Sequence, residues 1–467
     1  CKLSSGCASR SRPRCRREAG SAGMRALICV AALCVAQSSA LLPPSHHRRP
    51  APAAASRTRQ PRLALAVPAS PVPASARPAR TGPARVPFWQ GSAPPPSSDE
   101  AAPMLSGLQG QALRVEATDV PSRNQVRAVV PDHCYRRSTP RSLAYLAQSL
   151  LCTVACVAAG LTIPLHAAFL PLWLCYAVVT GTVAMGLWVL AHECGHGAFS
   201  DNRLLQDAVG YVLHSAMLVP YFSWQRSHAM HHAHTNHIYK GETHVPSVIE
   251  GRVGHETPGG EGELALAARM GATGHGAYQL FGHLTIGWPT YLLFGLTSGP
   301  KWSEGGGMSN HFWPFQGWGF SDVMWPGKWA RKVLSSTAGV AVALGVLSWW
   351  AAKVGGGAVL AMYGGPLLVI NAWLITYTWL QHTEVDVPHI SAEAFTFMRG
   401  AFLTIDRPYP PLIDWLHHRI GTTHVAHHID CTIPHYRAQE ATAAIQRAFP
   451  KAYLYDPTPV GAALWRI

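Results

Sequence analysis

Four apolar runs, each about 20 residues long, constrain the fold of this chain more than any other feature. They cover residues 142–163, 167–191, 332–352 and 357–380. Only 13% of the residues are charged, whereas soluble proteins average about 25%. The runs therefore predict four membrane-spanning helices. A fifth apolar stretch, residues 277–299, is interrupted by Gly, His283 and Pro289, so we expect it to be interfacial or re-entrant. The expected fold is an all-α polytopic membrane protein.

Basic residues mark one side of the membrane. They precede the first and third runs and follow the second: Arg136, Arg137, Arg141, Arg203, Lys301, Arg331 and Lys332. The positive-inside rule then places these loops, and both ends of the chain, on the same face. Residues 249–275 are rich in Gly and predict an inserted surface loop.

The first 98 residues have the composition of a targeting leader. They contain 15 Lys and Arg and one acid, and residues 99–467 contain 23 residues of each sign, so the net charge of +14 belongs to the leader. No basic face for nucleic acid is expected. Residues 24–40 are typical of a signal peptide, and residues 41–98 of a transit-like, disordered segment. This combination suits a plastid reached through the secretory route, with the endoplasmic reticulum as the alternative location.

Histidines cluster in the second half of the chain, where 21 of the 25 follow residue 190. His192 and His196 have i, i+4 spacing, and two later segments repeat the pattern HxxHH. These two segments contribute His228, His231 and His232, and His424, His427 and His428. The spacing places three imidazoles on one helical face, aimed at a common point. Eight such ligands are too many for one tetrahedral zinc, but they suit two metal ions with open positions for oxygen.

The order of runs and clusters tests this interpretation. The first two clusters lie between the second and third runs, and the third cluster follows the fourth run. Two further spans return the chain to the same membrane face, so all three clusters can meet. A crossing by residues 277–299 would put the third cluster on the opposite face.

Two other classes of protein fit parts of the pattern. His192–His196 matches the HExxH motif of zinc proteases, with Glu193 as the general base. Asp414 is then the nearest third ligand, but it lacks the Gly expected beside it, and both HxxHH segments would have no role. A histidine-rich metal transporter should bind its ion near mid-membrane, whereas these clusters flank the spans. About two irons per chain would favour an oxygen-activating enzyme, and one zinc the protease.

The sequence resembles the membrane-bound fatty acid desaturases, most closely the omega-6 (delta-12, oleate) acyl-lipid desaturases. The resemblance covers about residues 130–447. It rests on HECGHGAFSD, VPYFSWQRSHAMHH, LTIGWPTYLLFG, TYTWLQHT, RGAFLTIDRPY and HVAHHIDCTIPHY, in the order of the family. It implies a desaturase domain over residues 131–447, preceded by a linker (99–130) and followed by a C-terminal tail (448–467).

The resemblance implies two iron ions at the cytosolic or stromal face, held by nine histidines. These are His192, His196, His228, His231, His232, His424, His427, His428 and, after the last span, His382. Four acids are candidates for orienting the imidazoles, although capping or a solvated loop explains each equally well: Glu193, Asp201, Asp406 and Asp430. Trp224 and Trp379 are candidates for the wall of an acyl tunnel, although tryptophans at a membrane interface need no such role.

The implied reaction converts an oleoyl chain to linoleoyl with O2 and two electrons. The electrons would come from a separate cytochrome b5 or ferredoxin, because the chain lacks the His-Pro-Gly-Gly haem motif. Ala229 and Met230 are apolar where relatives often have polar residues, which leaves the position of the new bond open. Omega-3 desaturation, or hydroxylation or acetylenation on the same scaffold, are the alternatives.

Overall fold

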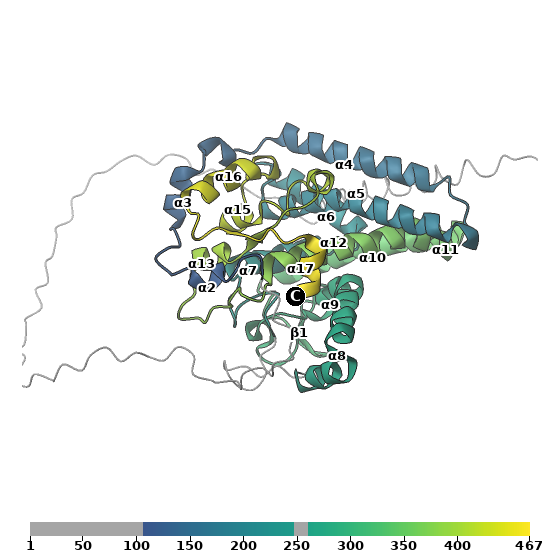
Figure 1. Ribbon diagram of the computed structural model, residues 1–467. Coiled ribbons are helices and arrows are strands. Elements are labelled where there is room, and N and C mark those ends of the chain that lie inside the picture. Colours follow the sequence, from purple (N-terminus) through teal and green to yellow (C-terminus); the bar gives the residue numbers. More distant parts are fainter. Residues whose placement is uncertain (1–105, 247–259) are drawn as a thin grey trace, which may run out of the picture. The chain divides into compact units, whose positions relative to one another are not determined.

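The computed structural model describes residues 106–246 and 260–467 (Figure 1). The predicted leader, residues 1–98, lies outside them. The described chain is mostly helical, with two pairs of two-residue parallel strands. Its short elements before and between the long helices include α2 (Gln111–Arg114), α3 (Arg123–Val129), η1 (Asp132–Tyr135), η4 (Pro300–Ser303), β1 (Met308–Ser309) and β2 (Phe320–Ser321).

Four of the described helices are long and apolar enough to cross a membrane. They are Thr139–Gly160 (α4), Ala167–His196 (η2, Ala167–Phe169, and α5, Leu170–His196), Trp329–Val354 (α10) and Gly356–His382 (α11, Gly356–Val359; η5, Leu360–Gly364; α12, Gly365–His382). Each contains one of the predicted apolar runs or most of it. The prediction of a polytopic α-helical membrane protein is confirmed.

Helix α5 is the central span. It packs against α4 and α12. In its most apolar 18-residue stretch 56% of the span is buried inside the protein, compared with 11% for the same length of α4. Helix α4 is therefore left to face lipid. A Cβ at Gly181 would lie 2.5 Å from the Cβ of Val369, so the missing side chain lets α5 and α12 approach closely. Gly197, at φ 76°, ends α5 immediately after His196.

Shorter helices gather at the end of the bundle where α5 and α12 terminate (Figure 1). They are α6 (Arg203–Ala216), α7 (Tyr221–Ala233), α13 (Phe397–Phe402), α14 (Pro411–Leu416), α15 (His424–Ile429) and α16 (His435–Ala448). Helix α7 packs against both α5 and α10, and the backbone N–H of Phe222 donates to Ser336 Oγ at 2.8 Å. The histidine-bearing segments before the third span and after the fourth therefore meet, as the predicted topology requires.

The stretch 277–299 does not form a membrane-length helix. It contains the end of α8 (Gly260–Gly282, kinked at Gly271), the π-helical η3 (His283–Gly287) and α9 (Trp288–Phe294). None of these qualifies as a span, which agrees with the four-span prediction; an interfacial position remains a prediction. The predicted loop over 249–275 is wrong from residue 260 onward, because Leu and Ala residues between the glycines favour a helix. Residues 249–259 lie outside the described residues.

The predicted linker (99–130) and the predicted C-terminal tail (448–467) both contain packed elements. In the expected linker, Ala112 of α2 and Val126 of α3 are buried. The expected tail forms β4 (Leu454–Tyr455), which pairs with β3 (Ile405–Asp406), and α17 (Val460–Arg466). Buried apolar side chains therefore pack parts of both segments against the rest of the described fold, and the domain boundaries stay a prediction.

Candidate metal centre

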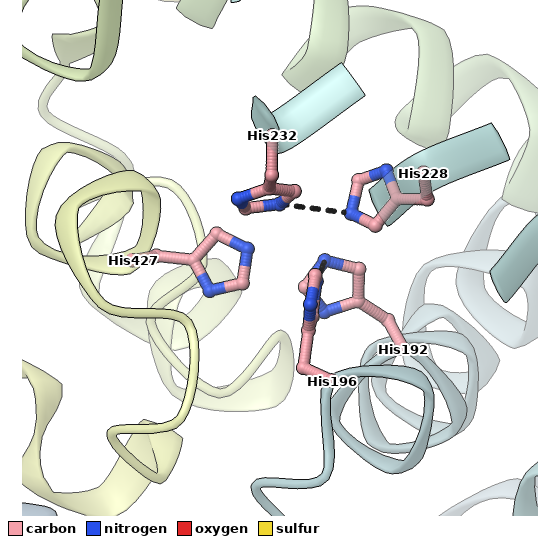
Figure 2. A group of neighbouring side chains, drawn as sticks. All are labelled: His192, His196, His228, His232 and His427. Atoms are coloured by element: carbon pink, nitrogen blue, oxygen red, sulfur yellow. Dashed lines mark hydrogen bonds between the residues drawn. The ribbon is translucent and has the colours of Figure 1, made fainter. Parts of the chain in front are cut away.

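The nine predicted ligands lie together where α5, α7, α12 and α15 meet. Eight of them form two groups, in each of which one nitrogen of every imidazole lies within 4.8 Å of the others. The first group, whose rings turn toward a common centre in Figure 2, is His192, His196, His228, His232 and His427. The second group is His231, His382 and His428. His424 adjoins it, with its Nε2 2.9 Å from Nε2 of His382.

Each HxxHH segment serves both groups. His228 and His232 join the first group, whereas His231 joins the second. The prediction that each segment aims its three imidazoles at one point is therefore wrong, because facing helices divide them. The rings of His232 and His428 stack 4.0 Å apart, so the two groups adjoin directly.

The imidazoles outside the spans are held neutral. Burial, strengthened by neighbouring imidazoles, lowers the pKa of His228, His232, His424 and His428 well below its ordinary value. Burial lowers the pKa of His231 and His427 to about 3. Neutral imidazole is the form that binds transition metals.

Six ring nitrogens of the nine histidines are buried with no hydrogen-bond partner among the described residues. They are Nδ1 of His192, His232, His382 and His424 and Nε2 of His427 and His428. Buried polar atoms in proteins nearly always have a hydrogen-bond partner. Ring nitrogens that are buried without one are therefore expected to bind a ligand, and a set of imidazole nitrogens fits a transition metal ion. Thr235 fixes one of these rings. Its hydroxyl donates to the carbonyl of His231 at 2.8 Å and lies 3.1 Å from His428 Nδ1, which leaves Nε2 of His428 for a ligand.

The four predicted acids have different positions. Asp406 is fully buried, and one of its oxygens accepts the backbone N–H of His424 at 2.5 Å and of Val425 at 3.0 Å. The other oxygen accepts the hydroxyl of Tyr453 at 2.6 Å. Asp406 therefore fixes the start of α15 rather than an imidazole.

Of the other three acids, Glu193 lies near a predicted ligand, His192. Its Oε2 accepts the backbone N–H of His435 at 2.9 Å, and its Oε1 lies 3.8 Å from His192 Nδ1. Asp430 accepts from Thr432 and pairs with Arg123. The side chain of Asp201 is 75% exposed and pairs with Arg137, so Asp201 lies in a solvated loop away from the centre.

The two predicted tunnel tryptophans also differ. Trp224 stacks on His228 with ring centroids 4.5 Å apart and lies 5.6 Å from His192, so it forms one wall of the first group. Trp379, one turn before His382, stacks on His283 at 4.3 Å. A role in an acyl tunnel remains a prediction for both.

A buried hydrogen-bond chain beside His228 was not anticipated. His311 Nε2 lies 2.9 Å from Ser227 Oγ, and Nδ1 lies 3.2 Å from the carbonyl of Leu292. The Tyr291 hydroxyl lies 3.2 Å from Ser227 Oγ and donates to Glu242 at 2.7 Å. These residues are far apart in the sequence, and no spacing pattern connects them.

The burial of His311 predicts a pH dependence of stability. Burial, partly offset by the bond to Leu292, lowers the His311 pKa to about 4, and the unfolded value is about 6.5. The unfolded chain gains this proton first, so stability present above pH ~6.5 is lost as the pH falls toward ~4. The stability advantage of the wild type over His311→Gln should shrink by about 1 kcal/mol between pH ~7 and ~5.5. Denaturant titration at both pH values measures it, and a constant advantage would contradict the prediction.

Comparison with known proteins decides the family. Residues 167–458 match the sequence profile of the Fatty acid desaturase family. The chain belongs to this family. It is 38% identical over 356 residues to the omega-6 fatty acid desaturase, endoplasmic reticulum isozyme 2, of Glycine max, covering 74% of this chain and 85% of the relative.

Further relatives agree. The desaturase is 35% identical over 353 residues to the Delta(12)-fatty-acid desaturase of Arabidopsis thaliana, covering 74% of this chain and 85% of the relative. Identity to the Delta(12) fatty acid desaturase of Mortierella alpina is 35% over 355 residues, covering 73% and 85%. The predicted family is confirmed, and the protein is a membrane-bound oxidoreductase.

Proposed function

We propose that this desaturase inserts a cis double bond at the delta-12 position of an oleoyl chain in an acyl lipid, giving a linoleoyl chain. The observation that carries the proposal is the meeting of nine histidines at one end of four apolar helices, eight of them in two adjoining groups and His424 beside the second. The three relatives are named delta-12 or omega-6 desaturases, which supports the position of the bond.

We propose that the two groups each hold one iron ion. His192, His196, His228, His232 and His427 would be the ligands of one ion, and His231, His382, His424 and His428 of the other. When bound, iron supplies the oxidising chemistry with O2 that removing hydrogen from an unactivated methylene requires and that protein side chains lack. The overall reaction consumes O2, two electrons and two protons, and it releases two waters per double bond.

The protein residues contribute binding and orientation. The neutral imidazoles present nitrogen donors, Thr235 fixes the ring of His428, and Asp406 fixes the start of the helix that carries His424, His427 and His428. Trp224 covers the first group, which restricts access of water to the donors. Glu193, at 3.8 Å from His192 Nδ1, is proposed to orient that ring.

The electron donor and the location are linked. The composition of residues 24–98 favours a plastid, where a ferredoxin would supply the electrons. The Glycine max relative is named for the endoplasmic reticulum, where cytochrome b5 would supply them. We propose the plastid and treat the endoplasmic reticulum as the alternative.

Expression in a yeast that makes oleate but no linoleate tests the function. Fatty-acid analysis should detect linoleate with its new bond at delta-12. An omega-3 product, a hydroxylated or acetylenic chain, or no product from well-expressed protein would contradict the delta-12 proposal.

A further inference from the structure

A fully buried arginine, Arg407, binds the chain at the end of α12, where His382 lies. Arg407 Nε donates to the carbonyl of Leu380 at 2.9 Å, and Arg407 Nη2 donates to the carboxylate of Glu384 at 2.8 Å. Leu380 and Glu384 stand two residues before and two residues after His382. One guanidinium therefore holds the chain on both sides of this histidine.

The C-terminal segment completes this charge cluster. Arg407 Nη1 also binds Asp456, which follows β4. Arg466, the last residue of α17, donates from Nε to Glu384 at 3.0 Å and from Nη2 to Asp456 at 2.8 Å. The side chains of Arg407, Glu384 and Asp456 are 0% exposed and that of Arg466 is 4% exposed. The four charges balance, two of each sign.

Asp406, the residue before Arg407, supports helix α15, which carries His424 and His428. Asp406 accepts the backbone N–H of His424, while Arg407 holds the chain around His382. Both of these histidines belong to the second group or adjoin it. Four of the five histidines in the first group come from α5 and α7, which the charge cluster does not contact in any of these bonds.

We propose that Arg407 and Arg466 are positioning residues for His382, and that the C-terminal helix thereby maintains the second metal position selectively. This inference rests on the proposed binding of two irons. Arg466 touches no predicted ligand. Arg466 acts through Glu384. Without Arg466, the buried cluster would contain two carboxylates, Glu384 and Asp456, and only one guanidinium, that of Arg407. Glu384 must then turn toward water or gain a proton, and the turn that holds His382 loosens.

Iron release from the purified holoenzyme to a chelator tests the proposal. In Arg466→Met, we expect about half of the iron to leave at least about 10-fold faster than from the wild type, because residues that support metal ligands typically contribute 10–100-fold to affinity. The remaining iron should leave at the wild-type rate. Arg447→Met, at an exposed position on α16, is the matched control and should release iron as the wild type does.

A double variant separates positioning from general damage. Arg466→Met combined with Glu384→Gln removes one charge of each sign, so we expect it to restore much of the slow release. The proposal is overturned if Arg466→Met releases all its iron at the wild-type rate, or if both halves leave faster together. It is also overturned if the double variant releases iron as fast as Arg466→Met. A wild-type enzyme that holds no iron would instead refute the proposed function.

Discussion

Replacing His228 with alanine is expected to abolish formation of the double bond. His228 lies in the first histidine group with His192, His196, His232 and His427, and alanine removes one of its nitrogen donors. The loss should exceed the 10–100-fold that is typical of residues that only support a ligand. Fatty-acid analysis of expressing yeast measures it, normalised to the amount of protein in membranes.

Two variants serve as controls for His228→Ala. His234 follows the same helix, and its ring nitrogen lies 3.2 Å from the carbonyl of Met230, outside both groups; His234→Ala should retain activity. Glu193→Gln should retain part of the activity, since an amide oxygen can still accept the N–H of His435. If Glu193→Gln were as inactive as His228→Ala, the hydrolytic interpretation of HExxH would regain support.

Replacing Asp406 with alanine is expected to destabilise the enzyme by about 3 kcal/mol and to remove its activity. The carboxylate accepts two backbone N–H groups and one hydroxyl, and each donor left unpaired in a buried place costs about 1–3 kcal/mol. Thermal unfolding in detergent should show a clearly lowered midpoint.

Asp406→Asn and Asp201→Ala are the control variants for the loss of stability in Asp406→Ala. The amide oxygen of Asn can still accept the two backbone N–H groups, so Asp406→Asn should lose less stability than Asp406→Ala. Asp201 is exposed, so its replacement should change the midpoint little, as usual for surface pairs. Equal midpoints for Asp406→Ala and Asp201→Ala would contradict the capping role.

The four spans and the meeting of the histidines could be predicted because both depend on local patterns. The length of each apolar run predicts a membrane-spanning helix, and the spacing of the histidines predicts that they share one face of a helix. An even number of spans then places the segments around His192, His228 and His424 on the same side. His382 was predicted only through the resemblance to the family, because a single histidine after a span has no distinctive spacing.

The parts that could not be predicted depend on contacts between distant segments. Whether His231 joins His228 or His382 is decided by the helix that faces it. Asp406 and Asp201 are both acids near a predicted cluster, yet Asp406 is fully buried in β3 and Asp201 is exposed to solvent. Glu384 pairs with Arg407 and also with Arg466, which is 82 residues away, and no pattern in the sequence connects them.

Metal analysis of the purified protein tests the central claim most directly. The two histidine groups predict about two irons per chain, and no stoichiometric zinc, in protein whose activity follows its iron content. One zinc per chain without iron would contradict the account, because a single tetrahedral ion uses only four of the nine clustered imidazoles.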